Sequence, residues 1–594
     1  MPRSRFVTQK PKNFKASLKV FFKSLKNYRL AILIPLIFAV AGNLLSLLSP
    51  TILGKMTNSA VASVRETGSL DLDFLKTSAF QLLVLYLVVA VLSYLQSFLL
   101  ARMTALYTKS LRSKIIEKIS RLPISYFDQH QFGDTLSVLG NDVDALSSSL
   151  SEEIVQIATN LTTVIGCLVM MFVISPSLAL VSVLVIPLST FAIAALAKKA
   201  QSHFSSQRTV LGKLNSHIEE DYSGQLIIKA NSHEAASISE FESVNQKLYT
   251  DSWKAQFLGS LAYPVVHFFT NLGYVAICVL GGNFVLSGRL LIGDIQAFLQ
   301  YTSRFNEPLT SLSQIVATVQ QTLAAAERVF NFLNEPEENP DPIPAKEIKK
   351  IHGEIEFHDV SFSYDKEKEI IKHFSAKVAP GEKVAIVGPT GAGKTTIINL
   401  LMRFYDPDSG YITIDGVPTT EMKRSSVRAL FGMVLQDTWL FSGTIKENLA
   451  YGNPKATLAD IRRATKSTNI DHLIESMKGG YAAEISEDSD NISAGEKQLL
   501  TIARAMIENP PMLILDEATS NVDTRAEELI QAAFERLTHG RTSFVIAHRL
   551  STIRNADLIL VMRDGNIVEQ GNHDSLLAQN GFYAELYNSQ FAES

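Results

Sequence analysis

Cysteine is nearly absent from this sequence: only Cys167 and Cys278 occur among 594 residues, each inside an apolar run. Two isolated cysteines argue against both a disulfide framework and a cysteine-based metal site. An excess of charge of one sign is also lacking, because the formal net charge is −4. The sequence therefore gives no general case for nucleic-acid binding.

Hydrophobic residues, by contrast, are plentiful, at 46% of the chain. A chain of 594 residues is too long for one core, so two or more domains are expected. The apolar excess falls in the first half of the sequence. From about residue 350 onward the composition is typical of a soluble α/β domain.

Six apolar stretches of the first half are candidate membrane spans, each of which needs roughly 20 residues of helix. They cover residues 30–48, 80–101, 154–175, 178–197, 257–282 and, for the sixth, 290–305 with a continuation beyond residue 305. The sixth is interrupted by Asp294, Gln296, Gln300 and Arg304. A helix of that polarity is expected to face a water-filled cavity. The alternative is a soluble helix after five spans, which would leave the C-terminal half across the membrane from the N-terminus.

Basic residues predict the orientation of these spans. Residues 1–29 carry nine Lys or Arg and no acid, and the long segments after the second and fourth spans are also basic. The loops 51–79, 176–177 and 283–289 are poorer in basic charge. The positive-inside rule then places the N-terminus, both long segments and the C-terminal half in the cytoplasm.

The N-terminal region could instead be a cleavable signal peptide, since Ala39-Val40-Ala41 resembles a cleavage site. The apolar run continues to Leu48, however, which favours an uncleaved span. One face of the preceding segment is apolar, with lysines opposite, and consists of Phe14, Leu18, Phe21, Phe22 and Leu25. This pattern is typical of a helix that lies on the membrane surface.

About 50 residues separate the second span from the third and the fourth from the fifth. Most simply, the membrane helices extend far beyond the bilayer and turn around, with tips at residues 125–134 and 224–234. Four prolines, at positions 336, 340, 342 and 344, indicate a linker. We therefore expect an N-terminal helix at 1–29, a membrane domain at 30–330, a linker at 331–351 and a nucleotide-binding domain at 352–594.

A phosphate-binding loop comes directly after the apolar strand pattern of residues 384–387. The sequence GPTGAGKTT precedes an apolar helix, which is the strand–loop–helix context that this motif requires. Its residues are Gly388, Pro389, Thr390, Gly391, Ala392, Gly393, Lys394, Thr395 and Thr396. Backbone N–H groups of the loop surround the phosphates and Lys394 neutralises the β- and γ-phosphates, while the Thr395 hydroxyl can reach Mg²⁺.

Two acids end the second apolar strand pattern, at Asp516 and Glu517. Asp516 is suited to contact Mg²⁺, directly or through water, and Glu517 to polarise an attacking water molecule. Adjacent acids are common on solvated loops but rare directly after four apolar residues. We therefore interpret this pair as catalytic machinery.

These motifs resemble the ATP-binding cassette family, in particular exporters that fuse six membrane helices of the type I exporter (type IV) fold to one α/β nucleotide-binding domain. The resemblance covers essentially the whole chain. It implies that Tyr364 stacks on adenine, that Gln436 contacts Mg²⁺ and water, and that His548 holds the γ-phosphate. It also implies that the stretch ending at Asp523 crosses between two nucleotide-binding domains. His548 could alternatively be an ordinary core histidine. The tips at 125–134 and 224–234 resemble coupling helices.

The family signature, usually Leu-Ser-Gly-Gly-Gln, reads Ile492-Ser493-Ala494-Gly495-Glu496 here. In the family, Ser493 and Gly495 would complete the ATP site of the opposite subunit. Ala494 adds a Cβ near the phosphate, and Glu496 adds a charge of the same sign as ATP. At about 5 Å and an effective dielectric near 20, that repulsion is on the order of 3 kcal/mol. Glu496 could also form a capping box with Ser493.

A deviant signature beside an otherwise complete site resembles the catalytic-glutamate subunit of heterodimeric bacterial multidrug exporters. The resemblance implies ATP-driven export of small amphipathic compounds across the cell membrane, with ATP and Mg²⁺, membrane lipids and a non-identical second half-transporter. Phe298, Tyr301 and Phe305 are expected among the cavity walls. Alternatives are a lipid flippase or peptide exporter, possibly homodimeric, an ATP-gated channel, and a soluble cassette ATPase acting on DNA or ribosomes. The spans argue against the last, and no peptidase-like segment precedes the first span.

Overall fold

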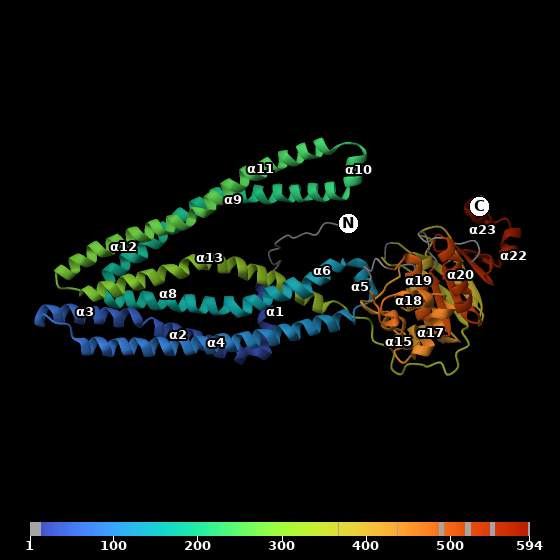
Figure 1. Cartoon of the computed structure of the whole chain (residues 1–594), viewed down its shortest axis with the longest axis horizontal. Coiled ribbons are helices and arrows are strands. Elements are labelled where there is room, and N and C mark those ends of the chain that lie inside the picture. The colour runs from blue at the N-terminus through green and yellow to red at the C-terminus, as the bar shows by residue number, and fades with distance from the viewer. Residues whose placement is uncertain are drawn as a thin grey trace. The chain divides into compact units, whose positions relative to one another are not determined.

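The structure is a computed structural model that describes residues 14–365, 368–435, 438–485, 492–516, 524–546 and 553–591. The chain divides into two compact units. The first unit comprises Met1–Ser120 and Gln131–Pro336, and the second comprises Arg121–His130 and Glu337–Ser594. The short segment Arg121–His130, drawn in blue in Figure 1, thus groups with the C-terminal part of the chain.

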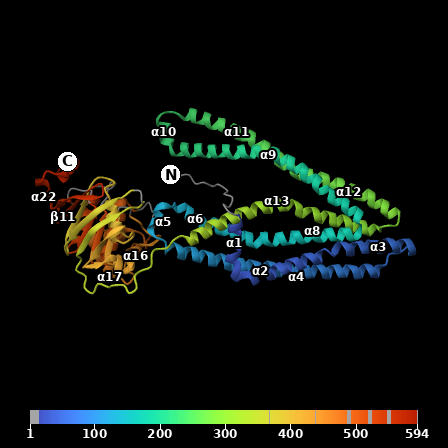
Figure 2. The same cartoon turned by 180° about the vertical axis from the view of Figure 1, so that it is seen from behind.

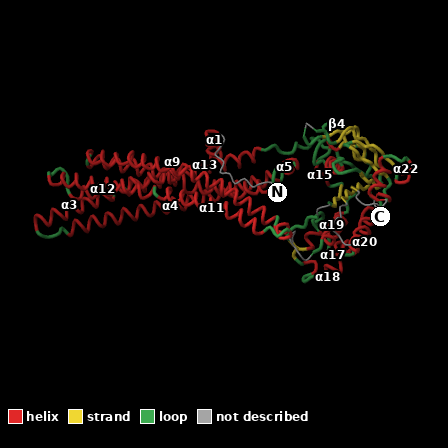
Figure 3. The backbone as a smooth tube through the Cα atoms, turned by 90° about the horizontal axis from the view of Figure 1, so that it is seen from above, coloured by secondary structure: helices red, strands yellow, loops and turns green. Residues whose placement is uncertain are grey.

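The secondary-structure elements in the described part of the first unit are all helices, as the red tubes of Figure 3 show. Its α-helices are α1 (Phe14–Ser24), α2 (Arg29–Ser46), α3 (Ser49–Thr67), α4 (Leu72–Ile119), α6 (Phe132–Ser137), α7 (Val143–Ser148), α8 (Ile154–Ile174), α9 (Pro176–Ser223), α10 (Gln225–Ala230), α11 (Glu234–Ser260), α12 (Ala262–Leu286) and α13 (Ile292–Asn334). A 3-10 turn, Leu25–Tyr28, joins α1 to α2. The π-helical turns Val138–Asp142 and Ser149–Glu153 flank α7.

The membrane helices do extend beyond the bilayer. Helices α4 and α9 each have 48 residues, or about 72 Å at ~1.5 Å per residue, more than twice the thickness of a hydrocarbon core. Figures 1 and 2 show that α9 ends at the short helix α10 and that α11 then returns alongside α9. The expected tips therefore coincide with short helices, α5 (Ile124–Gln129) and α10. Much of the expected connection at 51–79 is helical, because α3 continues to Thr67 before Gly68 ends it with a positive φ.

Five helical segments of the described chain are long and apolar enough to cross a membrane. They are Phe14–Thr67, Leu72–Ile119, Phe132–Ile174, Pro176–Ser223 and Glu234–Leu286. The sixth expected span forms α13, whose polar residues keep it below that threshold of apolarity. Helix α13 nevertheless packs within the bundle, against α3 and α8.

The aromatic residues of α13 correct one expectation. Phe298 and Tyr301 have no exposed surface and Phe305 is 2% exposed, so they belong to the helical core and do not form cavity walls. They pack with Cys167, Met171 and other apolar residues of the neighbouring helices. Hydropathy identified the helix but not its rotation, and the rotation turns this face toward α8 instead of a cavity.

A close crossing joins α3 to α13 at two glycines. A Cβ added to Gly54 would lie 2.5 Å from the carbonyl oxygen of Gly293, so a side chain at this point would force the helices apart. Asn58 of α3 accepts a hydrogen bond from the Gly293 N–H at 2.6 Å and donates to Asp294 at 3.1 Å. Small residues and interhelical hydrogen bonds are the usual means by which membrane helices associate.

The N-terminal helix differs in part from the expected surface helix. Phe14 and Phe22 are exposed, whereas Phe21 and Leu25 are buried within the helical unit. Ser17 donates a hydrogen bond to Glu327 of α13 at 3.0 Å. One part of the apolar face of this segment, with Phe21 and Leu25, therefore packs within the helical unit. Another part, with Phe14 and Phe22, is exposed.

The second unit is an α/β domain, and its strands appear as yellow segments in Figure 3. Its strands are β1 (Ile355–Phe362), β2 (Ile371–Val378), β3 (Lys383–Val387), β4 (Ser409–Ile414), β5 (Val417–Pro418), β6 (Phe431–Val434), β7 (Gly443–Thr444), β8 (Glu484–Ile485), β9 (Met512–Asp516), β10 (Thr542–Ile546), β11 (Leu558–Arg563) and β12 (Asn566–Gly571). Besides α5, its helices are α14 (Lys394–Leu401), α15 (Arg424–Arg428), α16 (Ile445–Leu449), α17 (Leu458–Ser467), α18 (Asp471–Ser476), α19 (Ala494–Glu508), α20 (Thr524–Thr538), α22 (His573–Ala578) and α23 (Phe582–Phe591). The described part of the domain also contains the 3-10 turns Thr419–Glu421 and Gly480–Ala482.

The described strands of this domain (Figure 2) form two larger sheets and a two-stranded antiparallel one, β7-β8. The largest has the strand order β12-β11-β3-β10-β9-β6, with β11, β3, β10, β9 and β6 parallel and β12 antiparallel. The second is antiparallel, in the order β2-β1-β4-β5. Parallel strands are buried on both faces, which explains the continuous apolar runs at β3 and β9. Their carboxyl ends lie at one edge, where ligands bind in sheets of this type.

Candidate functional site

The phosphate-binding loop connects β3 to α14 at the carboxyl edge of the large sheet. A Cβ at Gly388 would collide with the carbonyl oxygen of Met562, so only glycine fits where the loop leaves the strand. Gly393 caps α14 with a φ of 99°. Pro389, Thr390 and Gly391 are exposed, whereas Ala392 and Thr396 are buried. The ends of the loop are thus fixed by packing, whereas its middle residues are accessible. This arrangement is typical of an anion-binding loop.

Lys394 lies folded into this loop. Its Nζ donates hydrogen bonds to the carbonyl oxygens of Gly388 at 2.7 Å and Pro389 at 3.1 Å. Burial lowers the pKa of Lys394, and the negative charge of Asp516 acts in the opposite direction. The ammonium group therefore sits where a phosphate would replace carbonyl oxygens as its partner.

Asp516 lies near the loop because of strand register. It pairs with Ile546 of β10, which in turn pairs with Ile386 of β3, so the three positions are level at the carboxyl edge. Thr395 is exposed at the start of α14. A carboxylate and a hydroxyl are oxygen donors of the kind that Mg²⁺ prefers, and this pair of residues fits such an ion.

The ring of Tyr364 is fixed beside the helix that follows the loop. Its hydroxyl accepts a hydrogen bond from Asn399 of α14 at 3.0 Å. Phe362 and Tyr405 meet the ring edge-on, with centroids 4.9 Å and 5.0 Å away. The side chain remains 42% exposed, which leaves ring surface available for a planar ligand beside the phosphate cradle.

Tyr405 also links this aromatic cluster to α5. Its hydroxyl donates a hydrogen bond to the Asp128 carboxylate. Burial, and to a smaller extent this carboxylate, raise the pKa of Tyr405. The Glu338 N–H donates to the carbonyl oxygen of Arg121 at 3.1 Å. The first expected tip therefore docks on the α/β domain. Its Asp128 contacts Tyr405, and Tyr405 in turn contacts Tyr364.

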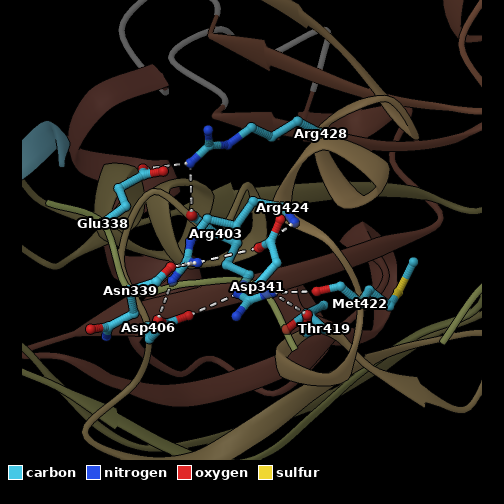
Figure 4. A network of polar contacts seen from close by, with 9 residues as sticks. All are labelled: Glu338, Asn339, Asp341, Arg403, Asp406, Thr419, Met422, Arg424 and Arg428. Atoms are coloured by element: carbon cyan, nitrogen blue, oxygen red, sulfur yellow. Dashed lines mark hydrogen bonds and ion pairs between the residues drawn. The ribbon is translucent and has the colours of Figure 1, made fainter. Parts of the chain in front are cut away.

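The linker is held to the same domain by a network of arginines (Figure 4). Arg424 is buried and donates to the carbonyl oxygen of Asn339 at 2.6 Å and to Asp406 at 2.9 Å. Its backbone N–H donates to Asp341 at 3.1 Å. Arg428 pairs with Glu338 at 3.0 Å. The chain is thus anchored where it enters the domain.

Arg403 supports this network from the other side. It is 6% exposed and donates to the carbonyl oxygens of Thr419 at 2.9 Å and Met422 at 2.7 Å. Its Nε also donates to Asp406 at 2.9 Å, so one carboxylate bridges Arg403 and Arg424. The linker prolines predicted the connection but not these partners.

The signature stretch begins α19 with a capping box. The Glu496 carboxylate accepts from the Ser493 N–H at 2.8 Å, and the Ser493 hydroxyl accepts from the Glu496 N–H at 3.4 Å. Ser493 is exposed and Gly495 is buried. Among the described residues, no hydrogen bond joins this pair to the phosphate loop, so the two parts of the site are separate within this chain.

Four candidate site residues lie outside the described residues: Gln436, Glu517, Asp523 and His548. The structure brings together Tyr364, the phosphate loop, Lys394 and Asp516. Sequence reasoning missed Asn399, Tyr405 and Asp128, which position the aromatic cluster. Their only sequence signal was their proximity to the motifs and to the expected tip.

Both halves of the chain match known families. The model of the ABC transporter transmembrane region matches residues 32–309, and the ABC transporter model matches residues 371–520. A fatty acid ABC transporter ATP-binding/permease protein of Mycobacterium tuberculosis is 48% identical over 504 residues, which are 85% of this chain and 80% of that protein. An ATP-dependent lipid A-core flippase of Syntrophus aciditrophicus is 35% identical over 521 residues, 88% of this chain and 86% of that protein.

A solved structure of a bacterial Atm1-family ABC exporter with ATP bound is similar as well. The TM-score is 0.72 and the identity 27%, over 96% of this chain and 99% of that one. Half-transporters of this architecture pair as dimers. The chain therefore belongs to the ABC transporter family: it is an ATP-hydrolysing, multi-pass membrane exporter half-transporter with a cytoplasmic nucleotide-binding domain.

Proposed function

We propose that this half-transporter exports amphipathic, multidrug-type compounds, paired with a non-identical subunit and powered by ATP with Mg²⁺. In this proposal residues 1–29 are an elbow helix, 30–330 the membrane domain, 331–351 the linker and 352–594 the nucleotide-binding domain. Thr395, Gln436 and Asp516 hold Mg²⁺, Glu517 activates water and His548 binds the γ-phosphate. Tyr364 and residues 388–396 bind ATP, while Ser493, Gly495 and Asp523 serve the dimer interface.

The observation that carries the substrate proposal is that α13 lines two cavities of different character. One, of about 460 Å³, is mainly apolar and is lined by residues such as Ile295, Leu299 and Tyr274. The other, of about 550 Å³, is lined mainly by polar side chains, with Asn160 and Arg304 among them. The helix α13 thus offers apolar surface on the face toward α12 and polar surface on the face toward α2 and α8, as a ligand with one apolar and one polar part requires.

A lipid flippase is the second candidate, and a specific observation favours it. The relatives reported above are named for a fatty acid and for the lipid A-core, and both names denote amphipathic molecules. Flipping of a bilayer lipid and export of a drug-like compound would use the same cavities. The two activities differ in whether the substrate remains in the membrane.

A transport assay tests the proposed function. In inside-out vesicles from cells that express this chain with its partner, we expect ATP-dependent accumulation of a fluorescent amphipathic dye. Lys394→Ala should remove that accumulation, because the charge that neutralises the phosphates is lost. A labelled phospholipid that changes leaflet without entering the lumen would instead identify a flippase. ATP-gated ion conductance without accumulation would contradict export.

Tyr364→Ala is expected to weaken ATP binding. Stacking of an aromatic side chain on a base contributes about 1–3 kcal/mol, so Kd should rise by roughly 5- to 150-fold. Turnover at saturating ATP should change less, since the proposed contact of Tyr364 is with the base and not with the phosphates. The measurement is the Kd of ATP for the purified dimer.

Two variants serve as controls for this measurement. Tyr364→Phe keeps the ring and loses only the hydrogen bond from Asn399, so its Kd should stay near that of the parent. Tyr411→Ala removes another tyrosine of the same domain, which is 46% exposed on β4, and should leave Kd unchanged. An unchanged Kd in Tyr364→Ala would make this ring an ordinary surface aromatic.

A further inference from the structure

Arg304 is a basic side chain in a helix of the membrane domain. It lies on α13, inside the region that matches the ABC transporter transmembrane family. A charged residue within a membrane helix is costly and persists where it faces protein, a water-filled cavity or a ligand. Its surroundings therefore show what the charge is for.

Few of the hydrogen-bond donors of this side chain have a partner among the described residues. A guanidinium group has five N–H donors, and Nη1 donates to the carbonyl oxygen of Ser46 at 2.9 Å. Among the described side chains, no carboxylate lies within ion-pairing distance of Arg304. The group is half-buried, so its remaining donors lie at the surface of a cavity.

That cavity has a volume of about 550 Å³ and lies between α2, α8 and α13. Its polar lining includes Asn43, Gln156, Asn160, Thr163, Arg304 and Ser311, and none of its described lining residues is acidic. The space is too large for one or two water molecules and large enough for a headgroup.

The other polar groups of the cavity are largely occupied by one another. The Asn43 amide donates to the carbonyl oxygen of Thr159 and to the Thr163 hydroxyl, both at 2.8 Å. Asn160 donates to the Ser311 hydroxyl at 2.9 Å. Arg304 is thus the strongest available donor in a cavity that offers no negative charge from its described lining. Planar, charge-assisted recognition by arginine suits a carboxylate or a phosphate.

We propose that Arg304 binds the acidic headgroup, a carboxylate or a phosphate, of an amphipathic substrate. The proposal rests on the proposed export function and narrows it to anionic amphiphiles. The apolar part of the substrate would extend from this cavity toward the apolar side chains of the membrane domain, with Leu47 already among the residues that line the cavity. Arg304 would thereby discriminate between an acid and its neutral ester.

The test is competition for a photoreactive 16-carbon fatty acid on the full-length chain and its partner in nanodiscs. The competitors are the unlabelled acid, its methyl ester, hexadecyl phosphate and inorganic phosphate. In the parent, the acid and hexadecyl phosphate should compete roughly tenfold better than the ester, as expected for a hydrogen bond to a charged group. Inorganic phosphate should compete poorly if the amphiphile is the ligand; strong competition by it would reassign the site to a free anion.

Arg304→Gln should remove the preference for both acids and leave competition by the ester unchanged, while Arg304→Lys should restore part of the preference. Arg289→Gln is the matched control, because Arg289 is exposed near Phe284 and outside the cavity. Equal competition by the acid and the ester in the parent would overturn the proposal. Loss of competition by both the acid and the ester in Arg304→Gln would overturn it as well.

Failure of this proposal is distinguishable from failure of the export function. If vesicles accumulate acidic and neutral amphiphiles equally well with ATP, export stands and the role of Arg304 falls. If no amphiphile accumulates with ATP, the export function itself falls, whatever the competition experiment shows.

Discussion

Replacing Glu517 with glutamine is expected to abolish nearly all ATP turnover while leaving ATP binding intact. The residue directly follows β9 and its neighbour Asp516, which lies level with the phosphate loop at the carboxyl edge of the sheet. A carboxylate at this point can accept a proton from the attacking water, and an amide cannot. General-base catalysis contributes about 10²- to 10⁴-fold to a rate, so the loss should be of that order.

The measurement is steady-state ATPase activity of the purified dimer, together with equilibrium ATP binding. The variant should also favour the closed pair of nucleotide-binding domains, because bound ATP is not consumed. Glu535→Gln is the matched control, since Glu535 is exposed on α20. Turnover above about a tenth of the parental rate would remove Glu517 from its assigned role.

The second large effect concerns the partner. Purified alone in lipid nanodiscs, this chain is expected to have low ATPase activity, and co-purification with a subunit carrying an ordinary signature should restore it. Glu496 of the capping box brings a carboxylate to the first turn of α19. A repulsion on the order of 3 kcal/mol toward ATP corresponds to roughly 100-fold in a rate.

The two signatures of such a pair are not equivalent. Each faces the phosphates bound by the other chain, so the productive site would combine Lys394 and Glu517 of this chain with the signature of the partner. Glu496→Gln should therefore leave most turnover of the complex intact. Replacing the signature serine of the partner by alanine should be severe. Drug-stimulated turnover of the chain alone at the level of full transporters would defeat the heterodimer and leave Glu496 as a helix cap.

The sequence by itself determined the parts of this protein whose signal is local. The phosphate loop is contiguous, and its glycines and Lys394 are needed wherever a strand turns into a helix around phosphate. Hydropathy likewise located the membrane helices, because a bilayer imposes a length on any segment that crosses it. The length of α4 and α9 was predictable from the spacing between spans.

Only the tertiary structure decided which side chains meet across elements. Tyr364, Tyr405 and Asp128 are far apart in sequence, and their contact depends on how α5 docks on the α/β domain. The apolar pattern of α13 did not specify its rotation, which buries Phe298 and turns Arg304 toward a polar cavity. Helix rotation is determined by packing, such as the contact of Gly54 with Gly293, and a pattern within one helix holds no information about its neighbours.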